Sequence, residues 1–237
     1  MNIPDANLDW STHTLKICFP NNLNRCGYRV LSIGFLVMLT ACSIPDRSRA
    51  LSDSSVPAST TALQVCANCH GAKGISVSPN FPNLAGQSQP YLVAQLKSFR
   101  SHGRSDPAGF EYMWGVSAHL SDTQINGLAD YYSSQKPAIG IAHEAVLLKD
   151  GQRIFEQGIV ASNVAACSTC HGAKGEGMQQ FPRIAGQHAD YTVKQLLVFQ
   201  QTDQRPDGAM MKAITHNLTT SNMKSVALYL ESMQSDK

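Results

Sequence analysis

The segment Cys66–Gly74 reads CANCHGAKG, and it returns 101 positions later at Cys167–Gly175 as CSTCHGAKG. In both copies two cysteines are separated by two residues, and a histidine follows directly. A helical turn over these residues brings the two thiols to neighbouring positions on one surface, with the imidazole next to them. The repetition predicts two sites of the same kind.

The motif C-x-x-C-H is the attachment signal of c-type haem. Two thiols three positions apart on a helical turn each add to one vinyl group of the haem, and the histidine that follows lies under the iron. The sequence therefore predicts two covalently attached haem c groups. The expected thioether residues are Cys66, Cys69, Cys167 and Cys170, and the expected proximal iron ligands are His70 and His171.

Three other uses of paired cysteines compete with haem attachment. Two pairs can form a zinc site, but zinc spacings are usually shorter and leave the histidine after each pair unexplained. A thioredoxin-like redox pair expects a βαβ context, which the sequence lacks. Structural disulfides are the third alternative, and an odd count of seven cysteines argues against a simple disulfide framework.

The repeat extends far beyond the two motifs and organises the chain. Matching pairs along the two copies include Phe81-Pro82 with Phe181-Pro182, Ala85-Gly86-Gln87 with Ala185-Gly186-Gln187, and Tyr91 with Tyr191. We expect one domain at 60–136, a linker at 137–144 and a second domain at 145–235. A linker this short should hold the two domains against each other.

Helical periodicity dominates both domains. Ser121 and Thr219 are expected N-caps, and each is followed by apolar residues at helical spacing. Further helices are expected at 90–100, 150–157 and 189–200. No segment shows a clear strand pattern of period two. The predicted fold class is all-α, with two small helical domains in tandem.

Each iron needs a second axial ligand from downstream of its motif. Met113 is the only methionine after the motif in the first domain. Met211 is the matching residue of the second domain, because each of the two precedes a matched leucine by seven residues. Met223 falls on an apolar helical stripe and is expected in the core. Ligation by His119 or His216 competes, but these histidines do not align between the copies.

Ligation by histidine and methionine raises the reduction potential relative to stronger donors. It also fills both axial positions, which leaves no open site for oxygen or a small-molecule substrate. The pattern favours an electron carrier without catalytic residues. A dihaem dehydrogenase or its subunit is the alternative, and it would need an open or unusual axial position. A haem-based sensor would need an output domain, for which no residues remain.

Two further pairs of matched residues are expected near the haems. The carbonyls of Pro82 and Pro182 are expected to accept the N–H of the proximal histidines and so fix their rings. Arg104 and Arg205, 101 positions apart, are expected to pair with haem propionates. Solvated surface arginines are the alternative.

The N-terminal part predicts export. Arg25 and Arg29 precede a mostly apolar run at 30–41, which has the length of a signal-peptide core and is shorter than the ~20 residues of a spanning helix. We expect residues 1–41 to be a signal peptide. An uncleaved membrane anchor is the alternative.

The apolar run ends in LTAC at Leu39–Cys42, which resembles the lipobox of bacterial lipoproteins. Cys42 is therefore expected to be lipidated and to attach the chain to a membrane surface, with an ordinary cleavage site as the alternative. Residues 42–59 are rich in Ser, Pro and charge, and are expected to form a flexible tether. The net charge is only +2 and no long basic block exists, so nucleic-acid binding has no support.

These residues resemble the dihaem cytochrome c4 family of bacterial class I cytochromes c. The resemblance rests on the paired motifs and the repeated P-x-(L/I)-A-G-Q segments, and it covers about residues 60–235. It implies two cytochrome c folds with facing haems, Met/His ligation and a periplasmic carrier that delivers electrons to a terminal oxidase. The implied partners are a donor reductase and an acceptor oxidase, and the lipobox is a departure from the family pattern.

Overall fold

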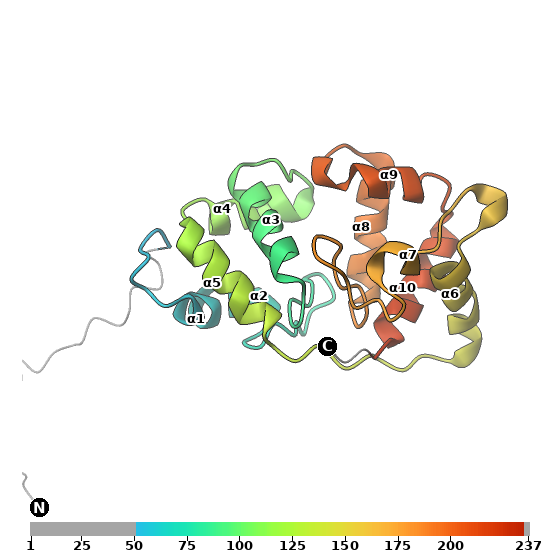
Figure 1. Ribbon diagram of the computed structural model, residues 1–237, viewed down its shortest axis with the longest axis horizontal. Coiled ribbons are helices and arrows are strands. Elements are labelled where there is room, and N and C mark those ends of the chain that lie inside the picture. Colours follow the sequence, from blue (N-terminus) through green and yellow to red (C-terminus); the bar gives the residue numbers. More distant parts are fainter. Residues whose placement is uncertain (1–50, 235–237) are drawn as a thin grey trace, which may run out of the picture. The chain divides into compact units, whose positions relative to one another are not determined.

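The computed structural model describes residues 51–234, in which two helical domains follow each other along the chain and contact each other (Figure 1). Within this range the regular secondary structure is helical, and the β contacts are two isolated bridges, Ile159–Val164 and Met178–Phe181. The predicted all-α fold is confirmed. None of the described helices is long and apolar enough to cross a membrane. The expected signal peptide and Cys42 lie outside the described residues.

The first domain starts with a continuous helical segment that leads into the first cysteine motif. Its elements are α1 (Ala58–Thr61), η1 (Ala62–Cys66), α2 (Ala67–His70), α3 (Gln89–Arg100), η2 (Gly109–Met113), α4 (Trp114–Ser117) and α5 (Asp122–Ser133). The elements η1 and η2 are π-helical turns, which occur frequently at functional sites. One ends at Cys66 and the other at Met113, so both turns place residues that the sequence singles out.

The second domain repeats this order with a longer first helix. Its elements are α6 (Ala145–Gln157), η3 (Val160–Ser162), α7 (Ser168–His171), α8 (Ala189–Gln201), η4 (Pro206–Gly208), α9 (Ala209–Thr215) and α10 (Thr220–Ser232). Helix α6 is longer than the expected 150–157 because its helical backbone begins directly after the linker. The bridge Ile159–Val164 closes a small loop between α6 and the second motif, and α7 carries that motif.

The core of the first domain forms where α5 packs against α1 and α3. Ser121 caps α5, since its hydroxyl accepts a hydrogen bond from the backbone N–H of Gln124. The cap fixes the start of the helix and turns its apolar stripe inward. The buried residues of this stripe are Ile125, Leu128, Ala129 and Tyr132.

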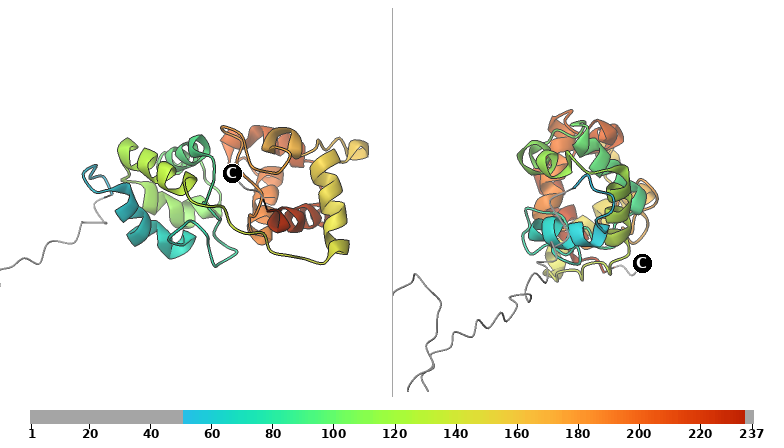
Figure 2. Two further views of the ribbon diagram at one scale, coloured as in Figure 1. Left: turned by 60° about the horizontal axis from the view of Figure 1, so that its bottom comes forward. Right: turned by 90° about the vertical axis from the view of Figure 1, so that its left-hand side faces the viewer.

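The core of the second domain forms where α10 packs against α6 and α8 (Figure 2). Thr219 and Asn222 form a capping box at the start of α10, as the expected cap predicts. Ile154 and Phe155 of α6 are fully buried in this core. Gly151 lies at the crossing, where an added Cβ would lie only 2.1 Å from the carbonyl oxygen of Ser225. Glycine at this position therefore allows the two backbones to approach closely.

The segment before α1 packs on the first domain. The amide of Gln124 donates to the carbonyl oxygens of Asp53 and Val56 at 2.9 and 2.6 Å. Val56 is buried, and Leu51 contacts the core cluster around α5. The folded part therefore begins before residue 60, the boundary expected from the sequence, because Gln124 and the core bind the end of the expected tether.

Candidate cofactor sites

The first candidate site is built on the turn that carries Cys66, Cys69 and His70. His70 is buried, and its Nδ1 lies 3.0 Å from the carbonyl oxygen of Pro82. A carbonyl oxygen only accepts hydrogen bonds, so Nδ1 carries the proton and donates it. The other ring nitrogen, Nε2, is then the atom available to a metal.

The second site repeats this arrangement on α7. His171 is buried, and its Nδ1 donates to the carbonyl oxygen of Pro182 over 2.8 Å. Phe81 and Phe181 stand edge-on to the two histidine rings, at centroid distances of 6.1 and 6.3 Å. The two sites therefore hold their imidazoles in the same tautomer and against the same kind of neighbour.

The ionisation states of the two histidines and of the cysteine thiols favour metal ligation over thiol redox chemistry at these sites. Burial lowers the pKa of His70 and His171, although the proline carbonyls oppose this in part, so both rings are held neutral, as metal ligation requires. Burial raises the pKa of the Cys66 and Cys167 thiols to about 11. A redox dithiol needs a low thiol pKa, so the thioredoxin-like alternative has no support here.

The other two alternatives for the cysteines also lack support from the geometry. The four cysteines of the motifs are free thiols, so no disulfide joins them. Within residues 51–234, no group of three or more His, Cys, Asp or Glu side chains gathers as a metal site of the zinc type.

Met113 and Met211 lie in matching surroundings, both half-buried. Met113 is the last residue of η2, and Met211 lies in the first turn of α9. Four residues after each methionine, a buried hydroxyl donates to its carbonyl oxygen: Ser117 Oγ to Met113 O at 2.6 Å, and Thr215 Oγ1 to Met211 O at 2.8 Å. The two methionines thus share a local backbone support.

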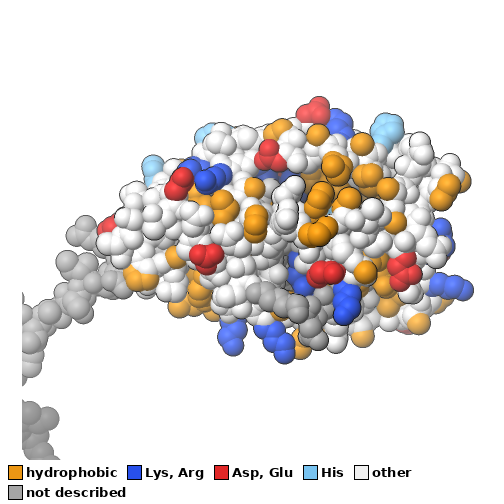
Figure 3. All heavy atoms as spheres, viewed as in Figure 1, with side chains coloured by type: hydrophobic (Ala, Val, Ile, Leu, Met, Phe, Trp, Pro, Cys, Tyr) orange, Lys and Arg blue, Asp and Glu red, His pale blue; other side chains and the backbone are white. Residues whose placement is uncertain are grey.

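Large apolar side chains stand exposed beside both motifs. Val77 and Tyr112 of the first domain are 99% and 52% exposed. Their counterparts by alignment, Met178 and Met210, are 55% and 59% exposed. Figure 3 shows apolar side chains gathered in the middle of one face, with charged side chains scattered around them. Exposed apolar surface of this kind marks a binding site.

The two expected arginines lie in a polar network where the domains meet. Arg104 is buried and pairs with Asp106, whose Oδ1 lies 2.8 Å from Arg104 Nε. The same guanidinium donates to Gln95 of its own domain at 2.8 Å and to Gln195 of the other domain at 3.1 Å. Arg104 therefore links the two domains directly.

Arg205 makes the reciprocal contacts. It donates to Gln195 of its own domain at 2.6 Å, and to Gln95 and Tyr91 of the first domain at 3.0 and 3.2 Å. Burial opposes ionisation of the Tyr91 hydroxyl, but the charges of Arg205 and Arg104 outweigh it and lower its pKa. With one carboxylate between them, the two guanidiniums leave a surplus of positive charge at this interface.

Sequence reasoning missed the partners of these arginines. Gln95 and Gln195 occupy matching positions in the repeat, which was the available signal, but the exchange of partners between the copies has no sequence signature. Asp106 matches Asp207 by position, yet Asp106 is fully buried and Asp207 is exposed. The near-symmetry of the two domains is therefore broken at this carboxylate.

The residues at both sites fit a covalently held haem c. Each site offers two free thiols and a neutral imidazole whose unbonded nitrogen is Nε2, all within one helical turn. A flat apolar group held by them would also offer apolar surface to the exposed Val77 and Met178, each seven residues after the histidine of its motif. The surplus cation between the domains suits an anionic substituent of such a group.

Comparison with known proteins also indicates two domains of the same kind. The family model for cytochrome c matches the chain twice, at residues 57–136 and 148–234. Cytochrome c4 from Stutzerimonas stutzeri is 35% identical over 180 residues, which cover 72% of this chain and 85% of the relative. The thiosulfate dehydrogenase electron acceptor from the same species, strain A1501, is 33% identical over 175 residues, with 71% and 78% covered.

The solved structure of cytochrome c4 from Acidithiobacillus ferrooxidans superposes with a TM-score of 0.67 and 40% sequence identity, and covers 71% of this chain and 98% of that protein. Two family matches in tandem and a c4 relative that aligns over most of both chains agree with the two matched sites. The chain belongs to the cytochrome c family, within which it is a dihaem cytochrome of the c4 type that carries two haem c groups and serves as an electron carrier of the periplasm.

Proposed function

We propose that both irons are ligated by one histidine and one methionine, His70 with Met113 and His171 with Met211, and that the protein relays single electrons without acting on a substrate. The observation that carries this proposal is the matched pair of sites. Each has a neutral imidazole held through Nδ1 by a proline carbonyl, and a methionine whose backbone is fixed by a buried hydroxyl.

A bound haem supplies an iron that changes its charge by one unit. The protein's own residues orient this chemistry. The proline carbonyls fix the rings of His70 and His171, and the bond from Nδ1–H increases the basicity of the ligating nitrogen. A thioether on the opposite side would complete the axial set, which leaves no position for a substrate.

Arg104 and Arg205 are proposed to face haem propionates from the interface. Asp106 pairs with the buried Arg104, and no carboxylate among the described residues pairs with the half-buried Arg205, so a second anion beside Arg205 would balance its charge. Each arginine is also stacked on a phenylalanine of its own domain, at 4.5 Å for Phe99 and 4.4 Å for Phe199. This stacking holds the guanidiniums in place whether or not the anion is bound.

Redox proteins are the partners of this carrier, and we propose a donor reductase and a terminal oxidase as the two classes. Attachment to a membrane through lipidated Cys42 would restrict the search for such membrane-bound partners to a surface. A second candidate role follows from one comparison: a relative of this chain is an electron acceptor of thiosulfate dehydrogenase. In that role the protein would take its electrons from a sulfur-oxidising enzyme.

The deciding measurement is a potentiometric titration of the haem-loaded protein with visible and near-infrared spectra. Two low-spin haems of high potential, both with the ferric sulfur-ligand band, are expected. Met113→Leu and Met211→Leu should each remove half of that band. Met223→Leu is the matched control, because Met223 is fully buried in the core of the second domain and should leave the band intact.

A high-spin haem, or one of markedly low potential, would contradict the symmetric ligation and point to catalysis at that haem. The two candidate donors are separated by reduction rates: the oxidised protein is mixed with thiosulfate dehydrogenase plus thiosulfate, or with a quinol-oxidising reductase. The faster reaction identifies the physiological class of donor.

A further inference from the structure

The peptide between Pro82 and Asn83 is held at both of its polar ends. Its carbonyl oxygen, on Pro82, accepts from His70 Nδ1 at 3.0 Å. Its N–H, on Asn83, donates to Oε1 of Gln187 at 2.8 Å. Gln187 belongs to the second domain, whereas His70 is the proximal histidine of the first. A single peptide group therefore connects the first site to a side chain of the other domain.

The second site has the mirror arrangement. The peptide between Pro182 and Arg183 accepts from His171 Nδ1 at 2.8 Å and donates through Arg183 N–H to Oε1 of Gln87 at 2.7 Å. Gln87 belongs to the first domain. Because Gln87 and Gln187 match in the repeat, the two domains exchange the same hydrogen bond, each toward the histidine of its partner domain.

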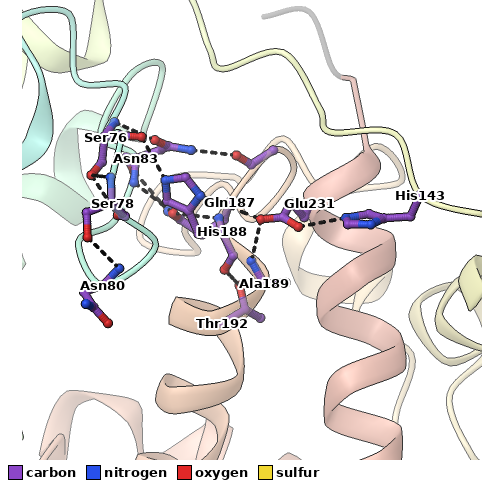
Figure 4. A network of polar contacts seen from close by, with 11 residues as sticks. Ser76, Ser78, Asn80, Asn83, His143, Gln187, His188, Ala189, Thr192 and Glu231 are labelled. Atoms are coloured by element: carbon purple, nitrogen blue, oxygen red, sulfur yellow. Dashed lines mark hydrogen bonds and ion pairs between the residues drawn. The ribbon is translucent and has the colours of Figure 1, made fainter.

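Both glutamines are fixed from two sides. The Nε2 group of Gln187 donates back to the carbonyl oxygen of Asn83 at 3.0 Å, and that of Gln87 donates to the carbonyl oxygen of Arg183 at 2.9 Å. The side-chain amide of each glutamine therefore bonds both the N–H and the carbonyl oxygen of a single residue in the other domain. Figure 4 shows this pair of bonds for Gln187 and Asn83. Both glutamine side chains are buried, so water does not replace these bonds.

We propose that each glutamine is a positioning residue for the proximal histidine of the opposite domain, so that Gln187 tunes the haem held by His70 and Gln87 tunes the haem held by His171. This inference rests on the proposed ligation by the two histidines. It extends that proposal by assigning control of each haem to the domain that does not carry it.

The physical basis is polarisation of a shared peptide. A peptide whose N–H donates a hydrogen bond has a more negative carbonyl oxygen, so hydrogen bonds in a chain strengthen one another. The bond from His70 Nδ1–H to Pro82 is then stronger, and the imidazole is a more basic ligand. A more basic ligand favours ferric over ferrous iron. Loss of the glutamine bond should therefore raise the reduction potential of the haem in the other domain.

The test compares Gln187→Met with Gln87→Met in the haem-loaded, full-length protein. Methionine has nearly the same length as glutamine but lacks the amide. We expect Gln187→Met to shift the potential of the His70 haem upward by more than that of the His171 haem, and Gln87→Met to give the opposite pattern. The Nδ1 proton of the affected histidine should also exchange faster with solvent, as measured by NMR.

The residue next to each glutamine offers a matched control. His188 Nε2 donates to the carbonyl oxygen of Ser76 at 3.0 Å (Figure 4). The hydroxyl of Ser88 donates to the carbonyl oxygen of Gln179. Each side chain thus forms a bond between the domains without contacting the two peptides. His188→Ala and Ser88→Ala should leave both potentials close to those of the wild type.

Potentials are assigned to haems by repeating each titration in a Met113→His background, where a second imidazole lowers the potential of the His70 haem. Equal shifts at both haems, a larger shift at the haem of the mutated domain, or no shift at all would each overturn the crossed assignment. Failure of the proposed ligation is recognised separately, because the wild-type spectrum would then lack two low-spin haems of the same type.

Discussion

Arg104 and Asp106 form an ion pair whose side chains are only 5% and 1% exposed, with Nε and Oδ1 2.8 Å apart. The pair is bidentate, since Nη2 also donates to Oδ2 at 3.2 Å. Asp106 also accepts a long bond from Gln195 of the second domain at 3.4 Å. The carboxylate therefore stabilises the charge of Arg104 at the point where the two domains meet.

Removal of this carboxylate should be costly. Asp106→Ala leaves the guanidinium of Arg104 buried without its counterion, so we expect the free energy of unfolding to fall by about 3–5 kcal/mol. Denaturant titration of the haem-loaded protein measures the change. Asp122→Ala is the control, because Asp122 pairs with Arg100 on the surface and its loss should change stability little. Similar losses in the two variants would contradict the role of burial.

The same pair predicts a pH dependence. Burial opposes ionisation of Asp106, but the hydrogen bond and charge of Arg104 outweigh it and lower the pKa. A carboxyl with a lowered folded-state pKa stabilises the protein above its unfolded pKa of about 3.9, and this contribution is lost as the pH falls through the folded pKa. The stability difference between wild type and Asp106→Asn should therefore be constant near neutral pH and shrink below about pH 4. A difference that does not change with pH would exclude ionisation of Asp106 as its source.

The sequence predicts those features of the protein that depend only on neighbouring residues within one copy of the repeat. The C-x-x-C-H motif predicts the cofactor. Ser121 and Thr219 predict the start of α5 and α10, because the side-chain oxygen of each accepts a hydrogen bond from a nearby backbone N–H. These signals are local. Each depends on only a few neighbouring residues, so it can be read from the sequence without knowledge of the tertiary fold.

The sequence did not predict which residues form contacts between the two domains. Gln87 and Gln187 stand out as matched residues of the repeat, but nothing in their own segments shows that each binds the backbone of the opposite domain. The burial of Asp106 has the same origin, because its environment includes Gln195, 89 positions away. Long-range pairing decides these roles, and a repeat pattern does not encode which copy supplies the partner.

Gly151 offers a sharp test of the packing of α6 on α10. Gly151→Ala places a Cβ 2.1 Å from the carbonyl oxygen of Ser225, so the helices must separate. We expect a loss of roughly 1–3 kcal/mol in the free energy of unfolding. Gln152→Ala changes the exposed neighbour on the same helix and should stay within about 0.5 kcal/mol of wild type. Thermal unfolding followed by circular dichroism distinguishes the two, and equal stability of both variants would show that the crossing tolerates a wider separation.

Lipidation of Cys42 is the prediction with the largest consequence for how the protein meets its partners. The lipobox-like LTAC segment predicts that Cys42 carries the lipid, so Cys42→Ser should move the haem protein from the membrane fraction to the soluble periplasmic fraction. Cys26→Ser, within the expected signal peptide, is the matched control and should leave the distribution unchanged. Haem staining of the two fractions, together with the intact mass of the mature chain, measures the outcome. If the wild-type protein is soluble and its mature mass matches the unmodified chain, the lipid anchor is wrong and the carrier diffuses through the periplasm. If the wild type is bound and Cys42→Ser is released, delivery of electrons is a surface reaction, because donor and acceptor are then searched for in two dimensions.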